Sequence, residues 1–269
     1  NLFLHITGRR PDGYHNLQTV FQLLDYSDEL DFQPSGDGTI NVSCNDSSIL
    51  AGENLVFRAA RLLQAYSNTA QGARIRLHKR LPIGGGLGGG SSDAATTLLG
   101  LNHLWELGLP TDELLQLGLQ LGADVPVFIQ GASAWAEGIG EILQPICLPQ
   151  SWYLVLTPPC HVATSEIFSH QQLTRNTAPI KIPAFPISGC KNDCEQVACL
   201  LYPEIRQALD WLGQYRQATM TGTGASIFAG FDSKEQAERV LAQKPGHLQG
   251  FVAKGVNTSP LQQALTRAA

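Results

Sequence analysis

Hydrophobic and polar side chains alternate through much of the first third of the chain, which is typical of β-strands. Residues 1–7 alternate from the first position. The other segments with this pattern lie at 17–33, 40–44 and 73–81. Turn-forming residues separate the segments at GRRPDGYHN (8–16) and PSGDGT (34–39). The second of these turns predicts a hairpin between its flanking strands.

Helical spacing of apolar residues appears in the middle of the chain. Residues 53–66 predict one amphipathic helix. A second helix is expected to start near Ser91 or Ser92, because serine is a favourable N-cap residue. A third helix opens at Pro110 and ends at Gly122, with acidic residues in its first turn.

The second half of the chain mixes strands and helices. A strand and turn are expected at 133–143, and the polar break LPQSW (148–152) marks a domain boundary. Further strands are expected at 152–159, 217–221, 226–231 and 249–254, and helices near 192–202, 204–214 and 233–242. We therefore expect an α+β fold with two domains, 1–148 and 149–269, in which helices cover one side of a sheet.

Composition narrows the classes of function. The chain has 269 residues, 43% of them hydrophobic, and a net charge of −5. No lysine- and arginine-rich run is present, which argues against nucleic-acid binding, and no apolar run approaches the length of a membrane span. The six cysteines lack zinc-site spacing and are expected to be free thiols. We expect a cytoplasmic protein, monomeric or homodimeric.

A glycine-rich segment, LPIGGGLGGGSSDAA (81–95), joins a predicted strand to a predicted helix. A flexible linker does not fit this position inside a domain. A dinucleotide-binding fingerprint lacks its following strand and acidic residue, and a Walker P-loop lacks its lysine, since Gly90-Ser91-Ser92 stands where G-K-[ST] belongs.

The interpretation that remains is an anion cradle at a helix N-terminus. Glycines let backbone N–H groups approach an anion, and the positive end of the helix dipole lies there. Ser91 and Ser92 add hydroxyl groups, either as donors or as a ligand for Mg²⁺. The segment therefore predicts a polyphosphate site.

Two further segments are candidates for the same site. MTGTGASIF (220–228) is a second glycine turn, which is equally compatible with an ordinary β-turn. Asp124 in GADVPVF (122–128) is either a turn or cap residue, or a general base near the phosphate.

These three segments together resemble the superfamily of galactokinase, homoserine kinase, mevalonate kinase and phosphomevalonate kinase. The superfamily motif P-x-x-x-G-L-G-S-S-A-A is similar to Pro82–Ala95 in a glycine-richer form, and its C-terminal glycine motif is similar to Thr221–Ala225. The resemblance implies a two-domain small-molecule kinase fold, with a βαβ-containing N-terminal domain and a ferredoxin-like C-terminal domain. It also implies ATP and Mg²⁺.

The resemblance sharpens at Arg10–His15 and at GADVPVF, and it spans essentially the whole chain. It implies a branch that uses ATP to phosphorylate a cytidine diphosphate alcohol on the non-mevalonate route to isoprenoid precursors. Another small-molecule alcohol kinase of the superfamily is the alternative. A nucleotide-binding regulator without catalytic activity is a third possibility.

The resemblance also implies roles for single residues. Asp124 is the expected catalytic residue. The ATP-binding residues implied are Pro82, Ile83, Gly84, Gly85, Gly86, Leu87, Gly88, Gly89, Gly90, Ser91, Ser92, Asn54 and Lys79, with Ser92 a candidate ligand for Mg²⁺. Lys79 would flank the adenine pocket, and Asn54 would either touch the base or start a helix.

For the substrate, the resemblance implies that Tyr14 and Phe168 stack on the two faces of the cytosine ring. His15 would then bond to the edge of the ring, with Thr164 and Asn1 nearby. The catalytic lysine of the family belongs to a P-A-K-x-N stretch whose asparagine matches Asn1. We expect that lysine in residues lost before Asn1, and no lysine of this sequence takes its role.

Overall fold

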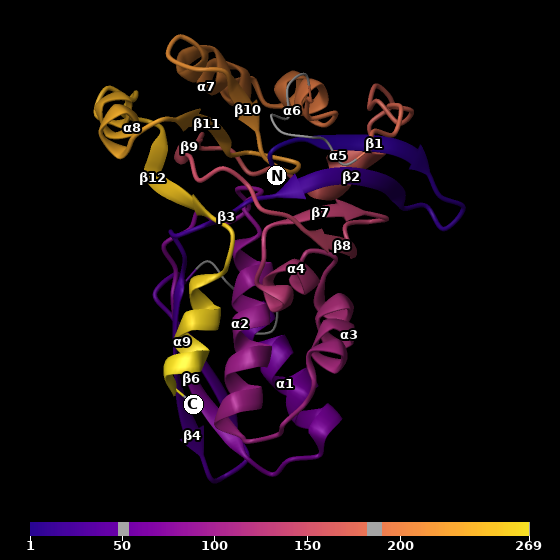
Figure 1. Ribbon diagram of the computed structural model, residues 1–269, viewed down its shortest axis with the longest axis vertical. Helices are drawn as coiled ribbons and strands as arrows, with labels where there is room; N and C mark the ends of the chain where they lie inside the picture. The colour runs from indigo at the N-terminus through magenta and orange to yellow at the C-terminus, as the bar shows by residue number, and fades with distance from the viewer. Residues whose placement is uncertain (48–53, 182–189, 269) are drawn as a thin grey trace. The chain divides into compact units, whose positions relative to one another are not determined.

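The computed structural model describes residues 1–47, 54–181 and 190–268 (Figure 1). By their internal contacts the residues form two compact units built from interleaved segments. The first unit comprises Asn1–Tyr26, Gly84–Leu87 and Ser133–Asn257, and the second comprises Ser27–Ile83, Gly88–Ala132 and Thr258–Ala269. The boundary expected between residues 148 and 149 falls inside the first unit, because the N-terminal strands pair with a strand that follows residue 132.

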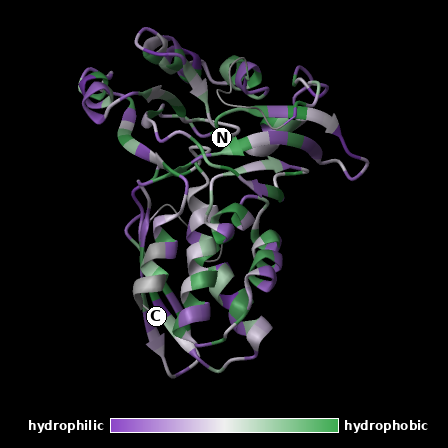
Figure 2. Cartoon of the chain, in the orientation of Figure 1, coloured by the Kyte–Doolittle hydropathy of each residue, from purple (hydrophilic) through white to green (hydrophobic). Residues whose placement is uncertain are grey.

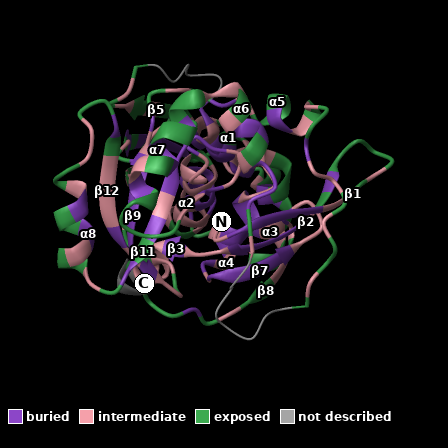
Figure 3. Ribbon diagram, turned by 90° about the horizontal axis from the view of Figure 1, so that it is seen from above, coloured by how far each residue is buried: buried purple, intermediate pink, exposed green. Residues whose placement is uncertain are grey.

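The first unit contains two sheets. One has the order β1-β2-β7-β8, made of β1 (Leu4–Arg9), β2 (His15–Phe21), β7 (Ala134–Glu137) and β8 (Ile142–Pro145). The other has the order β10-β11-β9-β12-β3, made of β10 (Ala218–Met220), β11 (Ile227–Phe231), β9 (Trp152–Thr157), β12 (Gln249–Val256) and β3 (Leu23–Leu24). All neighbouring strands in both sheets are antiparallel. Much of β2 and β7 is buried (Figure 3).

Helices of the first unit share one hydrophobic core with the five-stranded sheet. They are α5 (Thr164–Ser169), α6 (Glu195–Leu201), α7 (Pro203–Gly213) and α8 (Lys234–Leu241). Leu154 and Leu156 of β9 pack in this core with Leu212 of α7 and Ala237 of α8. The outer side of α8 is hydrophilic (Figure 2), as expected for a helix with one buried face.

The second unit is a three-stranded sheet with helices packed against it. The strand order is β4-β6-β5, made of β4 (Glu29–Ser35), β6 (Gly72–His78) and β5 (Ile40–Cys44). The helices are α1 (Leu55–Ser67), α2 (Gly89–Leu104), α3 (Thr111–Leu121), α4 (Val125–Gln130) and α9 (Pro260–Ala268). Alternate residues of β6 are buried, and Ile75 and Leu77 pack with Leu63 of α1 and Leu98 of α2.

The hairpin predicted at PSGDGT is wrong. β4 and β5 do not pair with each other, because β6 lies between them and pairs antiparallel with β4 and parallel with β5. The α1 crossover brings β6 beside β5, so β6 takes the edge of β5 that a hairpin would have used. The segment β5-α1-β6 is therefore a βαβ unit.

The start of α2 is also different from the prediction. The helix begins at Gly89, and its N-cap, Gly88, lies three or four residues before the serines that were expected to cap it. Gly88 has a φ of 69°, a left-handed conformation that glycine adopts readily. Ser91 and Ser92 therefore lie inside the first turn.

The helices α4, α5 and α9 were not predicted, and each has nine residues or fewer. The six cysteines are all free, as expected. Within the part of the chain that the structure describes, no helix combines the length and the apolar character needed to cross a membrane.

Candidate functional site

The first turn of α2 presents backbone donors without partners in the helix. Ser92 N–H donates to the Gly88 carbonyl at 2.8 Å, so the amides before it have no acceptor one turn back. No side chain caps this end of the helix. The N–H groups of Gly89, Gly90 and Ser91 are therefore available to an anion, and the helix dipole favours negative charge there.

Gly88 has no room for a side chain. A Cβ atom added at Gly88 would lie 2.8 Å from the ring of Phe128 in α4. The left-handed φ of 69° adds strain for any other residue. Both constraints explain the glycine at the position where the loop turns into the helix.

Asp124 is the N-cap residue of α4, but its side chain does not cap that helix. The carboxylate is half-buried and makes no hydrogen bond with any residue that the structure describes. Burial raises the pKa of this carboxyl group above its ordinary value. The positive charge of the chain's N-terminus lowers this pKa, but burial outweighs it. A carboxylate of raised pKa without a hydrogen bond is suited to accept a proton.

The corner between α3 and α4 lies against the first turn of α2. A methyl group at Gly122 would lie 3.9 Å from the Ser91 hydroxyl, and Phe128 of α4 faces Gly88. Because Asp124 belongs to the same corner, the second unit brings this predicted catalytic residue and the second half of the glycine loop into one region.

Lys79 lies in a buried charge cluster. Its Nζ atom is 2.5 Å from Asp28 Oδ2 and 2.9 Å from Asp93 Oδ2. The ammonium group is thus already paired with two carboxylates, and a role beside adenine remains a prediction. Asp28 was missed from the sequence, because it stands 51 positions from its partner and no motif marks it.

Asn54 is the N-cap of α1. Its side-chain oxygen accepts the N–H of Val56 at 2.9 Å, and the residue is buried. The structure thus contains the helix start that the sequence offered as one of two interpretations. Contact with the nucleotide base stays a prediction.

The two glycine motifs that the sequence singled out meet in the first unit. Ser226 N–H donates to the Gly85 carbonyl at 3.0 Å. A Cβ atom at Gly86 would lie 2.7 Å from the carbonyl oxygens of both Thr221 and Gly224. The Gly84–Leu87 half of the loop is therefore packed against the Thr221–Ala225 turn, backbone to backbone.

His15 and Phe168, both expected to bind the substrate base, lie in contact. Their ring centroids are 5.2 Å apart and the planes are 23° from parallel. The Nε atom of Arg175 donates to His15 Nε2 at 3.1 Å. Burial lowers the pKa of His15, and the cations Arg175 and Arg9 lower it further. A neutral imidazole whose Nε2 accepts carries its proton on Nδ1, where it can donate.

Arg175 was not found from the sequence, where it is a single arginine in a loop that contains no motif. In the structure its guanidinium also donates to the backbone carbonyls of Phe168, His170 and Leu173. It thereby holds α5 and the His15 ring together.

Three more residues are expected to contact the substrate: Tyr14, Thr164 and Asn1. Tyr14 ends the β1–β2 turn and is 61% exposed, which leaves its ring free to stack. Thr164 starts α5, and its hydroxyl is 3.0 Å from that of Thr223 in the second glycine turn. The side-chain amide of Asn1 donates to Thr19 at 2.8 Å.

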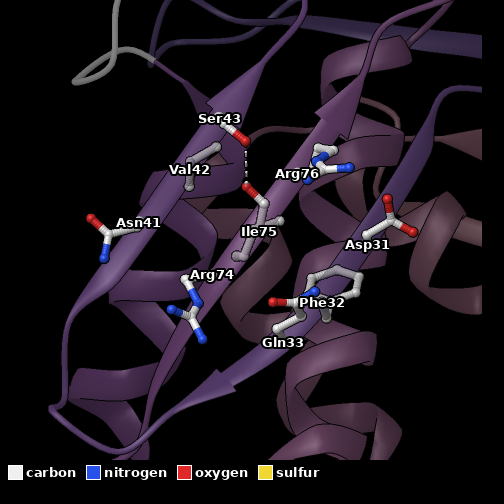
Figure 4. A pocket seen from close by; sticks show the side chains of 9 residues that line it. All are labelled: Asp31, Phe32, Gln33, Asn41, Val42, Ser43, Arg74, Ile75 and Arg76. Carbon is white, nitrogen blue, oxygen red and sulfur yellow. Dashed lines mark hydrogen bonds between the residues drawn. The ribbon is translucent and has the colours of Figure 1, made fainter.

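A separate hollow of about 630 Å³ lies on the second unit, at the face of the β4-β6-β5 sheet that carries the exposed polar side chains (Figure 4). Its lining residues are Asp31, Phe32, Gln33, Asn41, Val42, Ser43, Arg74, Ile75 and Arg76. None of the catalytic or binding residues predicted from the sequence lines this hollow. The hollow is therefore not the predicted phosphate site.

Among the described residues, no group of three or more histidine, cysteine, aspartate or glutamate side chains could hold a metal ion. A magnesium ion that arrives with a nucleotide needs no such group, because phosphate oxygens and water supply most of its ligands. The hydroxyl groups in the first turn of α2 fit that arrangement, since they lie beside the open amides.

Known proteins match this chain over nearly its whole length. The family model described as GHMP kinases N terminal domain matches residues 54–132, and the one described as GHMP kinases C terminal matches residues 188–245. The 4-diphosphocytidyl-2-C-methyl-D-erythritol kinase of Nitrosococcus oceani is 55% identical over 267 residues, which cover 99% of this chain and 95% of that relative.

Solved structures also match this chain along most of its length. A crystal structure of 4-(cytidine 5'-diphospho)-2C-methyl-D-erythritol kinase is 30% identical and superposes with a TM-score of 0.82, covering 96% of this chain and 97% of that one. The Methanococcus jannaschii mevalonate kinase has a TM-score of 0.66 at 14% identity, covering 91% and 93% of the two chains. This second likeness concerns the fold alone.

Proposed function

The chain belongs to the GHMP kinases, among the 4-diphosphocytidyl-2-C-methyl-D-erythritol kinases, and from this membership we propose that it phosphorylates the 2-hydroxyl group of that cytidine diphosphate alcohol with ATP. The structural observation that supports phosphate transfer is the start of α2. It combines open amides, a glycine cap and a nearby carboxylate that makes no capping hydrogen bond.

The glycine loop would bind the phosphates of ATP. The N–H groups of Gly89, Gly90 and Ser91 donate to phosphate oxygens, and the absence of side chains lets the nucleotide approach. Magnesium bound with ATP would reduce the charge of the phosphates, and the hydroxyl of Ser92 is a candidate ligand for it. These residues hold the donor in place.

Asp124 would act on the acceptor. As the substrate oxygen attacks the γ-phosphorus, the bond from that phosphorus to the β–γ bridging oxygen breaks and ADP leaves. The hydroxyl proton passes to Asp124, whose carboxylate has no other hydrogen-bond partner among the described residues. Most of the rate enhancement in such a transfer comes from positioning and electrostatic stabilisation.

Recognition of the cytosine ring would fall to the first unit. Tyr14 is exposed and can stack on a base, and the contact between His15 and Phe168 offers a second aromatic surface. The Nδ1 proton of a neutral His15 can bond to an acceptor on the ring edge. Such polar contacts select one base among several that stack equally well.

A coupled assay of ADP release tests the proposal. The purified protein is given ATP and Mg²⁺ with the cytidine diphosphate methylerythritol, mevalonate or homoserine. ADP release is expected with the first alcohol only. Release with mevalonate or homoserine instead would assign the chain to another alcohol kinase, and ATP binding without transfer to any alcohol would make it a regulator.

A further inference from the structure

Arg175 makes four hydrogen bonds through its guanidinium group. Its Nε atom donates to Nε2 of His15 at 3.1 Å. Its two Nη atoms donate to three backbone carbonyl groups, one at 3.1 Å and two at 2.9 Å. These bonds use four of the five N–H groups that an arginine side chain carries. The guanidinium group is therefore fixed in place, because any rotation would break several of the bonds at once.

The bond from Arg175 decides which nitrogen of His15 carries the proton. A guanidinium group only donates hydrogen bonds, because it stays protonated and has no acceptor atom. Nε2 of His15 must then accept with its lone pair, so the proton of the imidazole lies on Nδ1. Burial lowers the pKa of His15, and Arg175 and Arg9 lower it further, which agrees with a neutral ring.

The proton on Nδ1 of His15 is available to a ligand. Among the residues that the structure describes, none accepts a hydrogen bond from this nitrogen. The ring itself has little freedom to turn, because His15 is only 8% exposed and packs along the ring of Phe168. His15 therefore presents a single donor in a fixed direction.

The same guanidinium group closes the end of α5. It donates to the carbonyl of Phe168, in the last turn of the helix, and to that of His170, the C-cap residue. Carbonyl groups at a helix C-terminus have no partner within the helix, and arginine is a suitable donor to them. Arg175 thus holds both the imidazole of His15 and the helix that carries its aromatic neighbour.

Cytosine and uracil differ at N3 of the ring. N3 of cytosine accepts a hydrogen bond, whereas N3 of uracil carries a hydrogen and donates one. We infer that Arg175 is a positioning residue that selects cytosine over uracil, because it holds the proton of His15 on Nδ1, where that proton is donated to N3 of cytosine. This inference rests on the proposed function, which assigns the cytidine group of the substrate to His15. Uracil would bring two donors together, and a buried donor without an acceptor is costly.

Loss of the guanidinium group would release the proton of His15. A neutral imidazole then carries its proton on either nitrogen. With the proton on Nε2, Nδ1 becomes an acceptor and can take the N3 hydrogen of uracil. Each base would find a matching form of the ring, so the preference for cytosine should fall.

The test compares the dissociation constants of cytidine 5'-diphosphate and uridine 5'-diphosphate in the unmodified protein and in Arg175→Met. At about pH 8 a histidine of ordinary pKa is neutral, so the ring is neutral in both proteins. The unmodified protein should prefer the cytidine nucleotide by about tenfold or more, and Arg175→Met should lose about tenfold of this preference. Arg206→Met, at an exposed arginine of α7, is the matched control and should keep the preference.

A second pair of variants tests whether Arg175 acts through His15. The side-chain amide of asparagine has both a donor and an acceptor, and neither depends on Arg175. In the His15→Asn protein, the further change Arg175→Met should therefore leave the preference between the two nucleotides unchanged. A loss as large as the one expected with His15 present would show that Arg175 acts elsewhere, contrary to the inference.

Nitrogen-15 spectra of the histidine rings test the position of the proton without any change at Arg175. Bare and protonated ring nitrogens give well-separated signals, and His15→Asn identifies the signals of His15 among those of the seven histidines. A protonated Nδ1 and a bare Nε2 are expected in the unmodified protein. A proton on Nε2 would contradict the inference even if Arg175→Met did not fold.

A purely structural role for Arg175 would give a different result. Loss of the α5 cap alone would lower the melting temperature and weaken both nucleotides equally, so an unchanged preference in Arg175→Met would overturn the inference. Equal affinity of the unmodified protein for the two nucleotides would also exclude it. If the unmodified protein binds neither nucleotide, the proposed function fails and the inference fails with it.

Discussion

Helix starts within the second unit are built in two ways. At α1, the side chain of Asn54 accepts the N–H of Val56 and closes the helix end. At α2 the N-cap is Gly88, which has no side chain, and at α4 the N-cap Asp124 has a suitable side chain that makes no capping bond. The same unit thus closes α1 with a side chain and leaves α2, α3 and α4 without a side-chain cap.

This difference teaches where to look for a ligand. Capping with asparagine stabilises a helix by about 1 kcal/mol, so leaving it out costs stability. Without a side-chain cap, the amides of α2 stay open to an anion, and the Asp124 carboxylate stays open to a proton in the proposed reaction. The capped start at α1 stabilises the fold, and we propose that the starts of α2 and α4, among several uncapped helix starts, serve the reaction.

The largest expected effect is at Asp124. Asp124→Asn removes the proton acceptor and should lower turnover by about 10²–10⁴-fold, with ATP affinity nearly unchanged. Steady-state kinetics and ATP titration measure the two separately. Near-normal turnover would show that the open cap at α4 has no catalytic role.

The pH profile of the unmodified protein sharpens the same point. A base must be ionised to accept a proton, and burial raises the pKa of Asp124. As the pH is lowered, turnover should therefore begin to fall at a higher pH than it would with an aspartate of ordinary pKa. The acid limb should be absent from the residual activity of Asp124→Asn.

A side chain at the N-cap of α2 should prevent ATP from reaching the open amides. Gly88→Val places a β-branched residue at a φ of 69° and against the Phe128 ring, 2.8 Å from the new Cβ. The combined strain should weaken ATP binding by about 100-fold or more. Gly36→Val, where nothing lies within 4 Å, is the control, and unchanged affinity in Gly88→Val would remove the loop from the ATP site.

The first half of the glycine loop should respond through stability. Gly86→Ala drives a methyl group to 2.7 Å from the carbonyl oxygens of Thr221 and Gly224, at a φ of 69°. We expect a loss of about 1–3 kcal/mol in the free energy of unfolding. Denaturant unfolding measures it, with Gly213→Ala as a control in open space. A fully stable Gly86→Ala protein would contradict the backbone packing.

The smallest effect is expected at the capped helix. Asn54→Ala should cost about 1 kcal/mol of folding free energy and leave ATP affinity almost unchanged. Ser233→Ala removes the equivalent cap of α8, whose hydroxyl accepts the N–H of Gln236, and should behave alike. A large loss of ATP affinity in Asn54→Ala without a loss of stability would instead place Asn54 at the nucleotide base.

Most of the elements could be predicted from the sequence, because hydrophobic spacing sets them locally. The strand at β6 and the helices α1 and α3 follow their apolar patterns closely. The pairing of strands could not be predicted in the same way. A turn-rich segment such as PSGDGT indicates where a strand ends, but the partner of that strand is decided by the α1 crossover.

The candidate site divides along the same line. The glycine loop and Asp124 were predicted, since their residue types and positions carry the chemistry, although the cap at Gly88 was misplaced. The partners Asp28 and Arg175 were not, because they stand 51 and 160 positions from Lys79 and His15. Contacts at such separations are set by the fold, and a single sequence holds no local signal for them.

The place of β6 in the centre of its sheet has a consequence for folding. During synthesis, β4 and β5 are complete well before residues 72–78 are made. Until then, the edge of each strand that β6 will pair with has no partner strand. Pairings between distant segments form slowly, and exposed strand edges invite association with other chains. The second unit should therefore be most prone to aggregate while β6 is still being made, and chaperone dependence should concentrate in that interval.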